Sequence, residues 1–265
     1  MRRATNERGS SMTATQAQCG SISASTLGLP DATAVPRQKG TLPTAMFYAR
    51  TPVSSKLKQR FVNDIEAITM LAMLRPTNTG IAGTPKLEEI LVMGVRHSSA
   101  AAPIEVLDHI AGLRRSGIVF VCVRDRPSDE PSSQQASGHT EHGREPQRQE
   151  AALAMRRLMP GKPGHPQQTA VLVGPWRPAD AMRLELHGAD FGALWDSLCS
   201  QAVLDSTDGA DFDGRWAARA HIETLRAQEA KLTKDHARAK QPAQRNEIYA
   251  KLHKIRTELG RLDQR

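Results

Sequence analysis

The sequence has 265 residues, with 36 Lys and Arg against 28 Asp and Glu for a net charge of +8, and only 39% of its residues are hydrophobic. This length suits one sizeable domain with an appendage, and the low apolar content indicates that part of the chain lies outside a packed core. Its apolar runs are too short to cross a bilayer, no apolar stretch follows the N-terminal arginines as in a secretory signal, and the three cysteines are widely spaced. We therefore expect a cytoplasmic protein with no membrane contact.

The N-terminal segment is rich in Ser, Thr, Ala and Gln and shows no periodicity. Residues 1–26 are therefore predicted to be a disordered tail. Residues 27–43 contain three prolines, which predict an extended lead-in to the domain.

The stretch from Ser54 to Leu74, SSKLKQRFVNDIEAITMLAML, is predicted to be one amphipathic helix that ends before Pro76. Asp64 and Glu66 on such a helix would point about 200° apart, so they are interpreted as solvated charges and not as a catalytic pair. The apolar residues that recur every three or four positions are Leu57, Phe61, Ile65, Ile68 and Leu71.

A strand, a helix and a second strand are predicted to follow. The segment KLEEILVMGVRH ends at His97 and is rich in β-branched residues, and PIEVLDHIAGLRR begins with the proline of a helix start. The run GIVFVCVRDR from Gly117 to Arg126 is continuously apolar over its first half, which predicts a strand buried on both faces. Such a unit suits a sheet with a covering helix.

A polar stretch at about residues 127–150 is predicted to be a disordered insertion. It contains His139 and His142, a spacing that could supply two metal ligands, but no cysteine lies nearby. We therefore expect no metal site, and no other pattern indicates a cofactor.

The next segments complete the predicted domain. EAALAMRRLM fits either a helix or a hairpin arm, QTAVLVG and AMRLELHG are predicted strands, and ADFGALWDSLCSQAVL is predicted to be a helix with Trp195 on its core side. Residues 27–204 should thus form an α+β domain, a small mixed sheet with covering helices. Residues 205–214, DSTDGADFDG, have the composition of a linker.

Positive charge is concentrated at the C-terminus. Residues 215–265 hold 13 Lys and Arg against 6 Asp and Glu, a net charge of +7. Two helical patterns out of register, separated by Pro242, predict a basic helical hairpin or short coiled coil. Its candidate contacts for nucleic acid or a partner are Lys231, Lys234, Arg238, Lys240, Arg245, Lys251, Lys254 and Arg256.

Two kinds of partner are compatible with this hairpin. Its candidate cations suit a phosphate backbone. Because Tyr249 is the only Phe, Trp or Tyr between Lys231 and Arg256, base recognition is not expected. Alternatively, the apolar positions Ile248, Leu252 and Ile255 could dock a partner helix, and the charges would then serve solubility.

Several blocks resemble an uncharacterised bacterial family, catalogued as domain of unknown function 4391. They are LPDATAVPRQKGTLPTAMFY, SSKLKQRFVNDIEAITMLAMLRP, LEEILVMGV and HIETLRAQEAKL with RNEIYAKLHKIRTEL, and they extend from about Leu27 to Leu262. Members of this family tend to be encoded near helicases and DNA methyltransferases. The resemblance therefore implies a restriction-modification or phage-defence-like context, and it assigns no activity to any residue.

We therefore expect a non-catalytic accessory protein whose partner is a helicase or DNA methyltransferase subunit, with a hairpin that contacts the partner or nucleic acid. One alternative is a metal-dependent nuclease subunit. Against it, no Asp…Glu-x-Lys spacing is present, and the candidate acidic ligands are scattered, namely Glu88, Glu89, Glu105, Asp108 and Asp125. The other alternative is a coiled-coil signalling protein. No catalytic residue is identified from the sequence.

Overall fold

The computed structural model describes residues 15–49, 51–126, 149–159, 164 and 168–262. It divides into two compact units, residues 1–210 and 211–265. The division falls within the predicted linker, although helix α6 already begins at Phe212. His139, His142 and almost all of the predicted insertion lie outside the described residues, and Gln149 and Glu150 begin strand β7.

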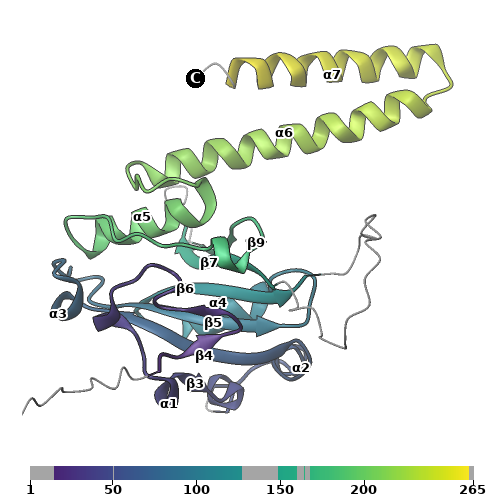
Figure 1. Ribbon diagram of the computed structural model, residues 1–265. Helices are drawn as coiled ribbons and strands as arrows, with labels where there is room; N and C mark the ends of the chain where they lie inside the picture. The colour runs from purple at the N-terminus through teal and green to yellow at the C-terminus, as the bar shows by residue number, and fades with distance from the viewer. Residues whose placement is uncertain (1–14, 50, 127–148, 160–163, 165–167, 263–265) are drawn as a thin grey trace, which may run out of the picture. The chain divides into compact units, whose positions relative to one another are not determined.

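The first unit is built on a mixed seven-stranded sheet, with order β3-β4-β5-β6-β7-β8 and with β9 also paired to β7 (Figure 1). Only β5 and β6 are parallel, and helix α4 connects them. The predicted α+β class is therefore confirmed. The strands of the sheet are β3 (Thr41–Leu42), β4 (Ile65–Leu74), β5 (Ile90–His97), β6 (Gly117–Asp125), β7 (Gln149–Leu158), β8 (Thr169–Val173) and β9 (Arg177–Pro178).

Helices cover both faces of this sheet. Neighbouring residues of a strand point to opposite faces, and on β7 Arg156 pairs with Asp108 of α4 whereas Arg157 pairs with Asp196 of α5. Helices α4 and α5 therefore lie on opposite faces. The helical segments of this unit are η1 (Asp31–Thr33), α1 (Arg37–Gly40), η2 (Thr44–Phe47), α2 (Ser55–Asn63), α3 (Pro76–Thr79), α4 (Ile104–Gly112), η3 (Ala179–Ala181) and α5 (Phe191–Leu204).

The predicted helix from Ser54 to Leu74 is wrong in its second half. Helix α2 is capped by Ser54 and ends at Asn63, and Ile65 to Leu74 form strand β4. Two register shifts interrupt the pairing of β4 with β5, and each extra residue of a bulge displaces the alternation of the strand. Buried apolar residues therefore recur at a spacing of three, which imitates a helix.

Asp64 and Glu66 consequently do not lie on one helix. Asp64 follows the end of α2 and pairs with Arg60, whereas Glu66 lies on β4, where Arg96 Nε of β5 donates to it at 2.6 Å. Both carboxylates are thus occupied by arginines, and they do not face one another as a pair.

The predicted disordered tail is also wrong for its last 12 residues, 15–26. Residues 15–26 form strands β1 (Gln18–Cys19) and β2 (Ile22–Ser23), and Cys19 is buried against Gly94 of β5. A Cβ at Gly94 would lie 2.3 Å from Cys19 Cβ, so the close approach requires glycine there. Residues 1–14 lie outside the described part of the chain.

Most other predicted elements of the domain are present. Strand β5, helix α4 and strand β6 fall where the sequence predicts them, and the open choice for EAALAMRRLM is decided in favour of strand. The predicted strand at residues 181–188 does not form. Its alternation reflects an extended segment whose Met182 and Leu184 are buried, and the backbone N–H of Leu184 donates to Leu27 O at 2.8 Å.

The second unit is a pair of helices, α6 (Phe212–Arg238) and α7 (Pro242–Leu262) (Figure 1). The two helices are antiparallel, because His221 near the start of α6 contacts Glu258 near the end of α7, and Arg256 Nε donates to Glu229 at 2.7 Å. The predicted C-terminal hairpin is therefore present. Among the described residues, no helix has both the length and the apolar character that crossing a bilayer requires.

Candidate functional site

The eight cations predicted for the hairpin are all exposed, but they fall into two groups. Arg256 pairs with Glu229, Lys251 pairs with Glu247 at 2.7 Å, and Arg245 donates to a backbone carbonyl. Within the described part of the chain, the other five have neither an ion pair nor a side-chain hydrogen bond. These unpaired cations are Lys231, Lys234, Arg238, Lys240 and Lys254.

Three of the unpaired cations share one face of α6. Lys231, Lys234 and Arg238 are separated by three and four residues, so their side chains follow one another along the helix. The row covers about 10 Å of helix axis, which corresponds to about three base pairs of a duplex. Lys240 follows directly after α6, and Lys254 lies on α7.

The apolar positions proposed for partner docking do not form a free surface. Ile248 and Leu252 are 9% and 4% exposed and pack with Ala239 and Leu232 inside the hairpin itself. Ile255 is half-buried. Helix α6 thus covers most of the α7 face that the sequence proposes for a partner helix, and docking there would require part of the hairpin to open.

Four of the five acidic residues considered for a nuclease are held by basic partners, and they are not gathered at one point. The fifth, Glu88, is exposed and has no ion-pair partner among the described residues. Glu89 pairs with Arg75, Glu105 with Arg60 and Lys56, Asp108 with Arg156, and Asp125 with Arg96. Within the described residues, no group of three His, Cys, Asp or Glu side chains could hold a metal ion. No observation therefore favours the nuclease alternative.

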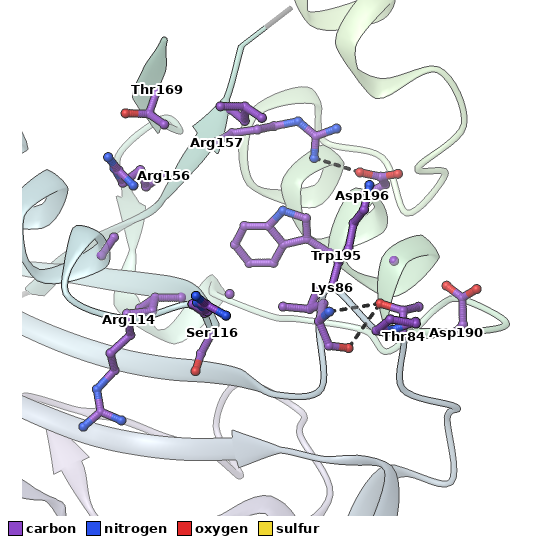
Figure 2. Close-up of a pocket in the computed structure, with 18 residues that line it drawn as sticks. Thr84, Lys86, Arg114, Ser116, Arg156, Arg157, Thr169, Asp190, Trp195 and Asp196 are labelled. Atoms are coloured by element: carbon purple, nitrogen blue, oxygen red, sulfur yellow. Dashed lines mark hydrogen bonds and ion pairs between the residues drawn. The ribbon is translucent and has the colours of Figure 1, made fainter. Parts of the chain in front are cut away.

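The first unit contains a cleft of about 950 Å³ that the sequence did not predict (Figure 2). It lies at the edge of the sheet where β6 begins and β7 ends, between the C-terminal end of α4 and the first turns of α5. Its chemically distinctive lining residues are Lys86, Arg114, Arg115, Arg156, Arg157, Trp195, Asp190 and Asp196.

Trp195 is half-buried in this cleft instead of belonging fully to the core as predicted. Its benzo ring rests on the backbone of β6, since a Cβ at Gly117 would lie 3.0 Å from Trp195 Cε3 and Cζ3. Figure 2 shows the indole with Arg157 and Lys86 beside it and Arg156 across the cleft, whereas the side chain of Arg114 extends away from the ring. The ring is thus fixed from one side, and part of it faces the cleft.

Positive charge dominates the cleft. Both of its carboxylates are occupied, since Asp190 accepts from the backbone N–H of Ala193 as the cap of α5 and Asp196 accepts from Arg157 at 2.7 Å. Arg156 pairs with Asp108, whereas Lys86, Arg114 and Arg115 are exposed and have no ion-pair partner among the described residues.

Sequence reasoning missed this cleft because its walls come from segments more than a hundred residues apart. The available signals were two arginine doublets, Arg114–Arg115 after α4 and Arg156–Arg157 near the end of β7. Neither doublet belongs to a known short motif, and only the fold brings them together with Trp195.

The family model described as "Domain of unknown function (DUF4391)" matches residues 27–259 of the chain. The chain belongs to this family. Neither the curated proteins nor the solved structures yielded a significant match to this DUF4391 chain. The match covers most of the sheet domain and of the hairpin, and every residue that lines the cleft lies within it.

Proposed function

We propose that this DUF4391 protein is a non-catalytic accessory protein that holds nucleic acid through the phosphate contacts of its C-terminal hairpin. The observation that supports the proposal is the set of five exposed, unpaired cations on α6, α7 and the turn between them. Cations without carboxylate partners attract phosphates without first breaking an internal ion pair.

The contact is sequence-independent. Between Lys231 and Arg256, which bound the candidate cations, Tyr249 is the only Phe, Trp or Tyr, and Lys side chains act as point charges. Binding should therefore be weak, should tolerate both duplex and single strands, and should fall steeply with salt as phosphate counterions are released.

The partner proposed for this protein is a helicase or DNA methyltransferase subunit in the bacterial cytoplasm, in a restriction-modification or phage-defence-like system. Support for this part comes from the family resemblance. Because Ile248 and Leu252 are buried within the hairpin, such a partner would meet a charged surface and not an apolar seam. Affinity capture from the native host with the full chain as bait checks the partner, and recovery of neither enzyme counts against it.

The nucleic-acid contact is tested with two double variants that remove equal charge. Lys231→Gln with Lys234→Gln removes unpaired cations, whereas Lys251→Gln with Arg256→Gln removes cations that already have carboxylate partners. Fluorescence anisotropy with labelled duplex and single-stranded DNA at several salt concentrations gives the affinity and its salt dependence.

The first variant should bind more weakly and should lower the slope of log K against log salt by about 2, since each phosphate contact contributes roughly one unit. The second variant should retain most of the affinity. Equal weakening by the two variants, or no binding by the wild-type protein at low salt, would refute the proposed contact.

A further inference from the structure

The cleft beside Trp195 is independent of the hairpin, and we propose that it binds a nucleoside phosphate, with the base against Trp195 and the phosphate at Lys86, Arg114 and Arg115. The ligand chemistry is a base joined to a phosphate, which either a free nucleotide or the terminal nucleotide of a single strand supplies. The inference goes beyond the hairpin contact, because it concerns a different unit of the chain and adds recognition of a base.

The size of the cleft fits such a ligand. Its volume of about 950 Å³ lies within the range of roughly 300–1,000 Å³ that is usual for sites of small molecules and cofactors. A second hollow of about 1020 Å³ adjoins it and shares Lys86, Arg115 and Ser116 in its lining. Lys86 and Arg115 thus lie where the two hollows meet. A phosphate bound to them would leave space in either hollow for the rest of the nucleotide.

The aromatic wall suits a planar base. Indole rings stack on nucleobases, and such stacking contributes about 1–3 kcal/mol per base. The contact of Trp195 with the backbone at Gly117 fixes the ring before a ligand arrives, so little side-chain entropy is lost on binding. A cleft that held only inorganic anions would gain nothing from this ring.

The free cations suit the phosphate. Lys86, Arg114 and Arg115 are exposed and unpaired within the described residues, whereas the cleft's two carboxylates are occupied by Ala193 N–H and Arg157. Two of these cations follow the C-terminus of α4 (Ile104–Gly112), where basic side chains also stabilise the helix dipole. That role accounts for neither Lys86, which comes from the loop before β5, nor Trp195.

Binding is measured by isothermal titration calorimetry and by tryptophan fluorescence. The probes are AMP, ADP and ATP, a 5′-phosphorylated thymidine oligonucleotide, and the two halves of the ligand, adenosine and pyrophosphate. Because the oligonucleotide can also bind the hairpin, its binding is measured with protein that carries Lys231→Gln and Lys234→Gln. The full chain is used throughout.

The decisive variant is Arg114→Gln with Arg115→Gln, and its matched control is Arg37→Gln with Lys39→Gln, which removes the same charge from exposed residues of α1. A third variant, Trp195→Phe, keeps a smaller aromatic ring. Thermal melts of all variants verify that they fold.

We expect a nucleotide to bind more tightly than either adenosine or pyrophosphate, and to lose about ten-fold or more in affinity with the Arg114, Arg115 variant. The control should stay within about two-fold, and Trp195→Phe should weaken nucleotides but not pyrophosphate. Tighter binding of the oligonucleotide than of free nucleotides identifies a strand end as the source, and the reverse identifies a free nucleotide. Absence of binding by every probe, equal losses in the matched variants, or pyrophosphate binding as tightly as the nucleotides overturns the proposal, whatever the hairpin does.

Discussion

The burial of Phe61 provides the sharpest test of the fold around α2. Its side chain is 0% exposed, and its ring lies 5.3 Å from that of Tyr48, 6.0 Å from that of His109 and 6.3 Å from that of Phe47. These contacts join α2, η2 and α4 over one face of the sheet. Replacing Phe61 by Ala removes the ring from all three neighbours at once.

The expected cost is about 3–5 kcal/mol, the usual range for Phe→Ala in a core, because the surrounding rings cannot close the cavity completely. For a unit of 210 residues, each kcal/mol corresponds to roughly 2–4 °C in melting temperature. The main thermal transition should therefore fall by about 6–20 °C.

The matched control is Val62→Ala on the same helix. Val62 is 63% exposed, so its truncation should change the free energy of unfolding by less than about 0.5 kcal/mol. Both variants are compared with the wild type by thermal melts and urea unfolding, monitored by near-UV circular dichroism. Similar shifts for the two variants, or a loss below about 1 kcal/mol for Phe61→Ala, would refute the packing described for α2.

Three further predictions concern single buried groups. Burial lowers the pKa of His97, so the unfolded chain binds a proton at this side chain more readily, and stability is lost as the pH falls through about 6.5. The melting temperature should therefore drop more between pH 7 and pH 5 for the wild type than for His97→Gln. Parallel curves of melting temperature against pH would contradict this. Burial raises the pKa of Cys19 and Cys122 to about 12, and Cys199 is buried too. A thiol reagent should therefore label the native protein far more slowly than the denatured protein. Rapid labelling of the native protein would argue against the burial of these cysteines. Gly94→Ala should destabilise by about 1–3 kcal/mol through its clash with Cys19; if Cys19→Gly does not reduce that loss in a double-mutant cycle, residues 15–26 do not pack as described.

The sequence predicted those elements whose apolar pattern directly reflects how they are buried, or whose ends carry a clear start or stop residue. Strand β6 is apolar at nearly every position because helices and loops cover both faces of the sheet, and Pro103 begins α4 clearly. Strand β4 was missed because the register shift between Ile65 and Ala67 leaves Ile65 and Ile68, three residues apart, on the same face. A spacing of three is otherwise the signature of a helix.

The N-terminal segment was missed for a different physical reason. Residues 15–26 bury small side chains, among them Ala17, Cys19 and Ala24, which contribute little apolar area and leave the composition looking polar. Their packing depends on glycines of other segments, since a Cβ at Gly40 would lie 2.3 Å from Ala17 Cβ. Such long-range complementarity has no local pattern in the sequence.

The candidate sites also divide into features that a local sequence pattern predicts and features that only the folded chain creates. The hairpin cations could be predicted because a helix presents its charges at regular spacing, but the sequence does not show which of them are paired. Only the folded hairpin shows that Arg256 is held by Glu229, whereas Lys234 has no ion-pair partner in the part of the chain that the structure describes. The cleft could not be predicted, since Trp195 and Arg114 meet only through the sheet that lies between their helices.

The two sites also differ in what they can recognise, and salt separates them. The hairpin offers point charges, so its hold on nucleic acid depends on counterion release and should fade at moderate salt. The cleft adds the ring of Trp195, and stacking on an aromatic ring does not depend on counterions. Raising the salt should therefore abolish the effect of Lys231→Gln with Lys234→Gln on oligonucleotide binding, while the effect of Trp195→Phe persists. If both effects vanish together, the ring makes no contribution of its own, and electrostatic attraction accounts for all of the binding.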